Sequence, residues 1–184
     1  MHETKRTARR ALLGARTAMP GPARAAADAA TWKALRDFLI ETVDEGATVA
    51  AYRPFGSEPG AALDPELPER LAMVYDVLLP VLLPDDDLAW ERIGGDVTGR
   101  EQGGPARVED AAAVVVPGLA VSHGGMRLGR GGGSYDRALA RVGPGVPVVA
   151  LLRDGEFGVE VPAEPHDRAV TGVITPAGGF TSLR

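Results

Sequence analysis

Short apolar runs alternate along this chain with segments of helical periodicity, and this alternation is what most limits the folds open to it. The runs at 47–52, 111–116, 146–152 and 170–175 have the length of buried strands. Such strands, with helices between them, are typical of sheets covered on both faces. The sequence therefore predicts an α/β fold: a single layered domain over 1–184, with a mainly parallel or mixed sheet flanked by helices on both faces.

Helices are predicted where apolar side chains recur at the spacing of one helix face, as Leu35, Phe38 and Leu39 do. Pro80 interrupts the apolar stretch 74–83, so a strand is expected on at least one side of it. The remaining expectations are helices at 1–16, 23–42, 65–71 and 135–141, a strand at 88–92, and loops at 53–60, 94–105 and 122–133.

Composition excludes several classes of protein. The chain contains no cysteine, so it has neither a disulfide framework nor a thiolate zinc site. Its longest uncharged apolar stretch, 111–121, has 11 residues and includes Pro117, whereas a membrane-spanning helix needs roughly 20 apolar residues. We therefore expect a cytoplasmic protein without a membrane partner, and we predict a monomer.

Charge is unevenly spread along the chain. The net charge is −5, but residues 1–24 carry six basic side chains and one acid, a local +5 that leaves −10 for the remainder. An acidic body argues against wide contact with nucleic acid, so no nucleic-acid partner is predicted. The basic N-terminal segment nevertheless has the charge to hold a small anion.

A glycine-rich stretch separates the apolar run 111–116 from the helix predicted after it. Six glycines fall within 124–133, Arg127 and Arg130 are interleaved with them, and no acid follows until Asp136. Glycines free backbone N–H groups to point toward one centre, and arginines supply forked donors that match phosphate oxygens. Ligands of open α/β sheets bind beyond the carboxyl ends of strands, where this loop is expected. The combination predicts a polyphosphate site.

Other interpretations of this loop compete with that one. Glycine-rich segments are often flexible linkers, and the sequence beginning at Arg130 is also an Arg-Gly-Gly pattern of RNA-binding segments. A Walker loop is excluded because the only lysines, Lys5 and Lys33, lie elsewhere. The dinucleotide-binding pattern fails because Ser134 occupies the place of its last glycine.

The same stretch resembles the signature of the 5-formyltetrahydrofolate cyclo-ligase family, in which a Pro-Gly-Leu turn leads to Gly-x-Arg-Leu-Gly-Arg/Tyr-Gly-x-Gly-x-Tyr-Asp. The resemblance extends over nearly the full chain but is strict only in this loop. It implies a ligase that converts 5-formyltetrahydrofolate and ATP to 5,10-methenyltetrahydrofolate, ADP and phosphate. A divergent paralogue that binds nucleotide without ring closure, or an RNA-binding module, are the alternatives. The matching positions are 117–120, 125, 127–131, 133, 135 and 136.

The resemblance also implies which residues bind ATP. Lys5 and Arg9 lie four residues apart on one face of the first predicted helix and would reach the phosphates. Arg127 and Arg130 would be the catalytic cations, because phosphoryl transfer needs charge neutralisation and alignment. The implied ATP-binding set is Lys5, Arg9, Arg127, Leu128, Gly129, Arg130, Gly131, Gly132, Gly133, Ser134 and Tyr135.

Folate and metal sites are implied in the same way. Glu58 matches a glutamate of the family's folate pocket, and Arg53 and Tyr135 would line the same wall. A carboxylate suits the paired N–H donors of a pterin ring. Asp167 matches an aspartate of the metal site, and Asp136 would complete it. The expected cofactor is Mg²⁺, a hard ion that prefers oxygen ligands.

Several positions depart from the family pattern. The loss of an aromatic side chain at Ser134 weakens the folate wall, so the resemblance supports ATP binding more firmly than the identity of the folate. The other departures are Val121 and Ser122, which stand where Phe-Asp is common, Gly132, which stands where some members have lysine, and Thr171 and Pro176, which replace acids.

Overall fold

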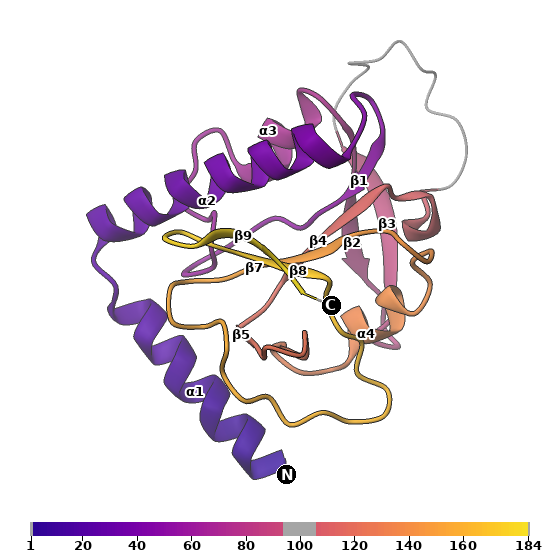
Figure 1. The fold of residues 1–184 in the computed structure, drawn as a ribbon. Helices are drawn as coiled ribbons and strands as arrows, with labels where there is room; N and C mark the ends of the chain where they lie inside the picture. The colour runs from indigo at the N-terminus through magenta and orange to yellow at the C-terminus, as the bar shows by residue number, and fades with distance from the viewer. Residues whose placement is uncertain (1, 94–105, 184) are drawn as a thin grey trace.

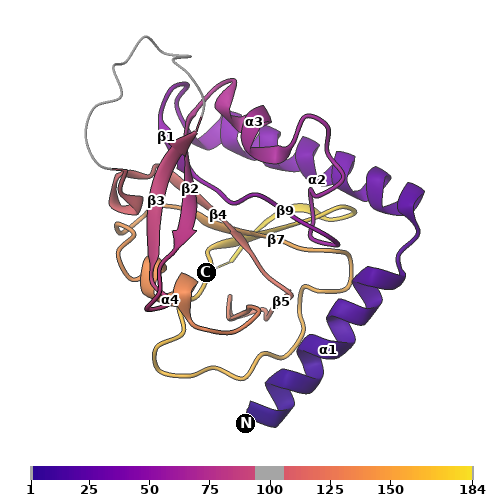
Figure 2. The same cartoon turned by 180° about the vertical axis from the view of Figure 1, so that it is seen from behind.

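The structure is a computed structural model that describes residues 2–93 and 106–183, so the loop expected at 94–105 lies outside the described residues. Figure 1 shows the fold and Figure 2 shows it from behind. In chain order the elements are α1 (His2–Ala18), α2 (Gly21–Thr42), β1 (Thr48–Ala50), α3 (Leu67–Ala72), β2 (Asp76–Leu82), β3 (Leu88–Ile93), the 3₁₀ turn η1 (Val108–Asp110), β4 (Ala113–Pro117), β5 (Ala120–Val121), β6 (Arg127–Leu128), α4 (Ser134–Leu139), β7 (Val148–Leu151), β8 (Gly172–Thr175) and β9 (Gly179–Ser182).

One mixed sheet of seven strands organises the molecule, in the order β3-β2-β1-β4-β7-β8-β9. The five inner strands run parallel, whereas β3 and β9 pair antiparallel at the two edges. The strand predicted at 111–116 is β4, and it lies between β1 and β7 inside the sheet. The α/β expectation and the inner position of this strand are therefore confirmed.

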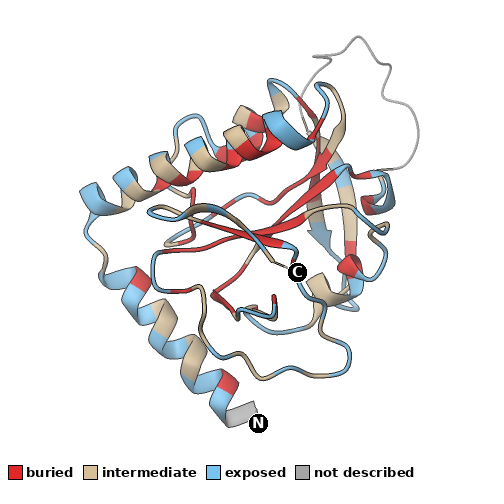
Figure 3. Ribbon diagram, in the orientation of Figure 1, coloured by how far each residue is buried: buried red, intermediate tan, exposed pale blue. Residues whose placement is uncertain are grey.

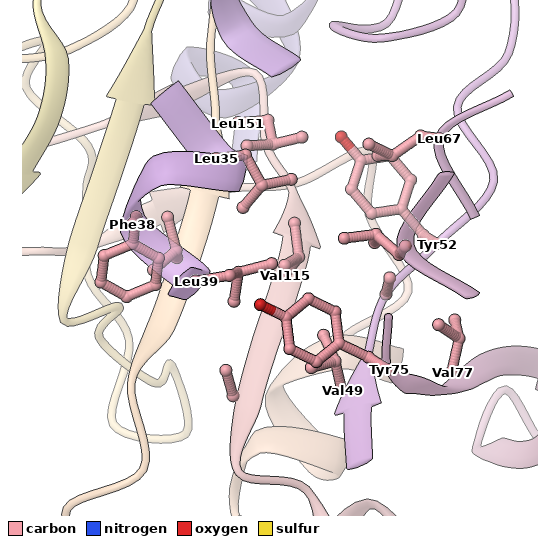
Figure 4. Close-up of a cluster of buried hydrophobic side chains, with 14 of the residues drawn as sticks. Leu35, Phe38, Leu39, Val49, Tyr52, Leu67, Tyr75, Val77, Val115 and Leu151 are labelled. Carbon is pink, nitrogen blue, oxygen red and sulfur yellow. The ribbon is translucent and has the colours of Figure 1, made fainter. Parts of the chain in front are cut away.

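Successive side chains of a strand point to opposite faces, and each face of this sheet has its own apolar core. On one face Val49, Val115 and Leu151 pack beneath Leu35 and Leu39 of α2, as the close-up in Figure 4 shows. All five side chains are fully or almost fully buried. The apolar stripe that the sequence predicted for α2 therefore packs on the sheet and positions this long helix.

The opposite face of the sheet is covered by α4 and by the loops around it. Val114, Ala150 and Val173 point to this side and pack with Leu139 of α4 and with Val108. Figure 3 shows the buried colour concentrated along the inner strands between these layers. Helices on both faces, as expected, make this a three-layer α/β arrangement.

Helix α1 lies apart from the central layers, beside the short β5–β6 ladder (Figures 1 and 2). Its apolar side chains Leu12 and Leu13 pack against a small buried cluster that includes Leu119 and Leu128. In the part of the chain that the structure describes, no helix combines the length and the apolar character required to cross a bilayer.

The order of the sheet creates a switch point beside β1. From β1 the chain passes to β2 on one side, and it later returns to form β4 on the other side. Open α/β sheets bind ligands in the crevice that such a reversal leaves at the carboxyl ends of the strands. The segments that leave β1 and β4 there are the ones that begin with Ala51 and Gly118.

The strand at Pro80 is continuous rather than interrupted. β2 extends from Asp76 through Pro80, which lies opposite Trp90 of β3. Pairing with β1 ends at Leu78, so beyond that point β2 has one neighbouring strand. Proline has no backbone N–H to donate. It is tolerated there because the strand has a neighbouring strand on one side only.

Candidate active site

A cleft of about 830 Å³ opens between α1, the glycine loop, α4 and the segment 164–168. It reaches the turn after β4 at Pro117 and Gly118, which is the switch-point position. The sequence-predicted ATP residues all line this cleft, namely Lys5, Arg9, Arg127, Leu128, Gly129, Arg130, Gly131, Gly132, Gly133, Ser134 and Tyr135.

The first half of the glycine loop is held by a small ladder that the sequence did not predict. β5 and β6 pair antiparallel, and the N–H of Leu119 donates to the carbonyl of Leu128 at 2.8 Å. Leu128 is buried beneath α1 and fixes the loop from below. The expected irregular loop at 122–133 is therefore a tight hairpin followed by a glycine turn.

The second half of the loop has backbone angles that only glycine adopts easily. Gly131, Gly132 and Gly133 have φ values of 118°, 87° and 68°, and α4 begins at the next residue, Ser134. A side chain at these three positions would strain the turn. The glycines therefore allow the backbone to curl around the cleft, as the sequence pattern indicated.

Arg127 lies deep in the cleft, with a side chain only 5% exposed. Its Nη1 donates to the carbonyl of Pro117 at 3.0 Å, and its Nη2 is 3.8 Å from a carboxylate oxygen of Asp136. The guanidinium also faces the ring of Tyr135 at 5.3 Å. Burial lowers the pKa of Arg127 from its usual value. Its Nε is buried and has no hydrogen-bond acceptor among the described residues.

Arg130, the second arginine of the loop, meets the predicted folate residue Glu58. Arg130 Nε donates to Glu58 Oε1 at 3.2 Å, and its guanidinium lies 4.8 Å from the centre of the Phe55 ring. Glu58 is buried, and its other oxygen accepts from the N–H of Phe55 at 3.1 Å. The Glu58 carboxylate is thus fixed at the point where the glycine loop and the loop after β1 meet.

Helix α1 sends two cations into the cleft from the other direction. Lys5 is buried, and its Nζ lies 3.4 Å from both Glu164 and Asp167. Arg9 Nε donates to the carbonyl of Gly129 at 2.8 Å. The spacing of these two residues on one helix face is therefore reproduced, with both side chains directed at the glycine loop and the 164–168 segment.

The predicted metal residues Asp136 and Asp167 line the same cleft but belong to different clusters. Asp167 gathers with Glu164 and His166, whose ligand atoms lie within 4.8 Å of one another. Asp136 is outside this group and accepts from the N–H of Arg168 at 3.0 Å. Two carboxylates fit the oxygen preference of Mg²⁺, whereas an exposed imidazole contributes less to it.

Glu164 is a site residue that the sequence reasoning did not single out. The signal for it was present, because Glu164 and Asp167 are three residues apart in the Pro-Ala-Glu-Pro-His-Asp segment. The N–H of Glu164 donates to a carboxylate oxygen of Asp167 at 2.8 Å, which closes the segment into a turn. This turn brings both carboxylates to the Nζ of Lys5.

A second hollow, of about 400 Å³, adjoins the cleft at Arg130, Glu58 and Tyr135. Its wall is aromatic, and burial raises the pKa of both Tyr52 and Tyr135 above the usual value. The predicted folate residues Arg53, Glu58 and Tyr135 all line it.

Arg53 is oriented by α3 within that wall. Its guanidinium forms ion pairs with Glu66 and with Glu69, the second at 2.6 Å. The hydrogen bonds that Arg53 donates to these acids, with Glu69 the larger cause, raise the pKa of Arg53. Arg53 therefore links the loop after β1 to α3, and it also borders the hollow.

The positions that depart from the family pattern have structural partners here. Thr171 Oγ1 accepts from the N–H of Val148 at 2.8 Å, and Ser122 Oγ accepts from the N–H of Met126 at 3.1 Å. Val121 is buried in the β5–β6 ladder. Of these departures, only Ser134 and Gly132 line the cleft.

Comparison with known proteins agrees with the sequence resemblance. The sequence model of the 5-formyltetrahydrofolate cyclo-ligase family matches residues 1–176. A 5-formyltetrahydrofolate cyclo-ligase of Mycolicibacterium smegmatis is 40% identical over 169 residues, which cover 83% of this chain and 85% of that protein.

Two solved structures share the fold. The 5,10-methenyltetrahydrofolate synthetase of Mycoplasma pneumoniae superposes with a TM-score of 0.76 at 19% identity, covering 92% of this chain and 96% of that one. The enzyme of the same name from Aquifex aeolicus gives 0.77 at 24% identity, covering 98% and 93%. These likenesses support the architecture, and the match over residues 1–176 together with the 40% identical relative shows that the chain belongs to the 5-formyltetrahydrofolate cyclo-ligase family.

Proposed function

We propose that this chain catalyses the ATP-dependent conversion of 5-formyltetrahydrofolate to 5,10-methenyltetrahydrofolate, with release of ADP and phosphate. One observation carries the proposal. In an acidic chain, the cations Lys5, Arg9, Arg127 and Arg130 line a single cleft around the glycine loop. Such a concentration of positive charge and backbone donors matches a polyphosphate.

ATP occupies the larger cleft in this proposal. The glycine turn at 131–133 supplies backbone N–H groups, and Arg127 supplies positive charge at the wall of the cleft. Lys5 and Arg9 close the cleft from α1, on the side opposite α4. The phosphates therefore lie between two sets of cations, which is the arrangement that neutralises charge during phosphoryl transfer.

The folate occupies the adjoining hollow. Glu58 offers a buried carboxylate to the N–H groups of the pterin edge, and Tyr52, Phe55 and Tyr135 provide apolar and aromatic surface. Arg130 lies between the hollow and the cleft, because it lines both. It is therefore positioned at the boundary where the formyl oxygen and the γ-phosphoryl group would meet.

In this reaction the protein aligns the two substrates and neutralises charge, and it supplies no nucleophile. The formyl oxygen attacks the γ-phosphorus and ADP leaves; N10 then attacks the resulting iminium carbon, and phosphate leaves as the ring closes. Arg127 and Arg130 stabilise the charge that moves between the oxygens. Holding both substrates in contact replaces a bimolecular encounter, which is the other contribution the protein makes.

Mg²⁺ is part of the proposal. When bound it would supply positive charge at the transferring phosphates. Glu164 and Asp167 would hold it, with Asp136 on the same side of the cleft. Lys5 now lies between those two carboxylates, and a divalent ion there would release its Nζ toward the phosphates.

The remaining parts of the proposal are a monomeric state, a cytoplasmic location and the lack of a nucleic-acid partner. The absence of cysteine fits a reducing compartment. Mass measured by light scattering tests the monomer, and a salt titration of RNA binding tests the partner, since binding through Arg130 would fall steeply with salt.

Phosphate release tests the function against its alternative. The proposed enzyme releases phosphate from ATP only when 5-formyltetrahydrofolate is present. A paralogue that binds nucleotide without ring closure would bind ATP but show no release that depends on the folate. Equal release with and without the folate would also contradict the proposal, because it would make the chain a simple ATPase.

A further inference from the structure

Four buried charges form a continuous network beside the cleft, and one of them, Arg16, also lines it. Arg16, Asp28, Arg153 and Glu156 are between 0% and 5% exposed. Arg16 donates from Nε and Nη2 to the two oxygens of Glu156, each at 2.7 Å. The backbone N–H of Arg153 donates to Glu156 at 2.7 Å, and the Arg153 guanidinium pairs with Asp28. The network joins α1, α2 and the segment after β7.

The remaining hydrogen bonds of the Arg153 guanidinium go to the loop that carries Glu58. Its Nη2 donates to the carbonyls of Ser57 at 3.2 Å and of Glu58 at 3.0 Å. Asp28, the ion-pair partner of Arg153, accepts from the N–H of Ala62 at 2.8 Å with its second oxygen. The pair therefore holds this loop at two places, Ser57–Glu58 and Ala62.

The contacts of the Arg153–Asp28 ion pair with this loop are more specific than the stability of the fold requires. A buried ion pair seldom stabilises a fold more than apolar side chains of the same volume would. Here the pair instead satisfies loop carbonyls and an N–H that point away from solvent. The main chain of Glu58 is held by Arg153, while its carboxylate projects to the opposite side, toward Phe55 and Arg130.

We propose that Arg153 is a positioning residue for Glu58, which aims the Glu58 carboxylate into the hollow and thereby sets the affinity for the folate rather than for ATP. The inference rests on the proposed role of Glu58 in folate binding. Arg153 itself lines neither the cleft nor the hollow, so it acts through the loop and does not touch the substrates.

Arg153→Lys is the informative substitution. Lysine keeps the positive charge beside Asp28, so no unpaired buried charge is created. It lacks the planar fork that binds Asp28 and two carbonyls at the same time. The variant therefore releases the loop while it retains the ion pair.

Steady-state kinetics at a temperature well below unfolding separate a positioning role from a purely structural one. We expect the KM for 5-formyltetrahydrofolate to rise about fivefold in Arg153→Lys, the factor of roughly one ordinary hydrogen bond. The KM for ATP should stay within about twofold, because the hydrogen bonds of Arg153 go to Asp28, Glu156 and the Glu58 loop and not to a proposed ATP-binding residue. Equal rises in both KM values would overturn the inference.

A double-mutant cycle with Glu58→Gln tests whether Arg153 changes the folate KM through Glu58. If Arg153 acts through Glu58, Arg153→Lys adds little to the folate KM of Glu58→Gln, since coupled residues are not additive. Additive effects would overturn the inference. So would a changed folate KM in Glu58→Gln together with an unchanged one in Arg153→Lys. An unchanged folate KM in Glu58→Gln itself would overturn the folate role of Glu58 and this inference with it.

Two further variants guard against loss of folding. Leu39→Val shortens a core side chain of α2 that lines neither the cleft nor the hollow, and it should lower the melting temperature without separating the two KM values. Should Arg153→Lys fail to fold, Asp28→Asn combined with Arg153→Gln removes both charges together. This double variant carries the same expectation, a raised folate KM with a nearly unchanged ATP KM.

Discussion

Arg130 and Glu58 form an ion pair, 3.2 Å long, that joins the glycine loop to the loop after β1. The two side chains are unequally exposed, Arg130 at 45% and Glu58 at 5%. The buried carboxylate is thus the fixed member, and the exposed guanidinium is the member free to move toward a phosphate. This asymmetry places Glu58, the proposed folate-binding residue, on the rigid side of the pair.

Glu58→Gln should weaken folate binding selectively. Glutamine retains the shape and can still accept from the N–H of Phe55, but it loses the charge that favours paired N–H donors. We expect the KM for 5-formyltetrahydrofolate to rise at least about tenfold, the loss of a charge-assisted hydrogen bond. The ATP KM should change little. A larger change for ATP than for the folate would contradict the assignment.

Lys5→Ala and Arg9→Ala should each raise the KM for ATP more than the KM for the folate. Both side chains enter the cleft from α1; Lys5 is buried and Arg9 is half-buried. Arg10→Ala is the matched control, because Arg10 is an exposed cation on the same helix and does not line the cleft. If all three variants behave alike, general electrostatic attraction rather than contact with ATP explains the effect.

Asp136→Asn should lower turnover by at least about tenfold, a barrier change of ~1.4 kcal/mol. Asparagine can still accept from the N–H of Arg168, so the melting temperature should stay nearly constant. The charge opposite Arg127 is lost, and the Mg²⁺ requirement should shift upward. Asp167→Asn should act in the same direction.

The contrary result for Asp136 is equally clear. Turnover that is normal at low Mg²⁺, together with a loss of stability, would make Asp136 a structural residue of the turn. The ion would then depend on the Glu164 and Asp167 pair, which the structure already gathers.

Arg53→Met should weaken the fold above pH 4.5 and have less effect in acid. A hydrogen bond from Arg53 lowers the pKa of Glu69 from its ordinary 4.5. The native state therefore gains stability once the unfolded chain ionises, and this gain disappears as pH falls through the lowered value. The pair is largely exposed, so the expected loss is below about 1 kcal/mol.

Thermal unfolding at pH 7 and pH 3 measures this effect. The difference in melting temperature between Arg53→Met and the unaltered chain should shrink at pH 3. Glu69→Gln is the matched variant and should show the same pattern. A difference that grows in acid would contradict the assignment of the ion pair.

Sequence periodicity predicted the layered fold well, because buried strands and amphipathic helices leave local signals. It missed β9, whose residues Gly179–Ser182 alternate in burial but carry no long apolar run. Phe180 of this strand stacks on Phe38 of α2 at 4.2 Å, a contact between distant segments that no local pattern records. The β5–β6 ladder was missed for the same reason, since each strand has two residues.

The same distinction between local sequence signals and contacts of distant segments applies to the candidate site. The turn at 131–133 was predictable because positive φ values favour glycine at fixed positions, whereas phosphate binding by the loop stays a prediction. The pairing of Glu58 with Arg130, 72 positions apart, was not predictable, since it depends on the switch point that brings two loops together. The network around Arg153 likewise joins residues from α1, α2 and the segment after β7.

The central claim is that the cleft and the adjoining hollow align ATP with 5-formyltetrahydrofolate, and the absorbance of the methenyl product tests it most directly. Purified chain is mixed with 5-formyltetrahydrofolate and Mg²⁺, and the absorbance is followed with and without ATP. The account predicts product only with ATP, one phosphate released per methenyl group formed, and a much slower rate in Arg127→Lys. Methenyl product formed equally fast without ATP, or ATP consumed without methenyl product, would contradict it.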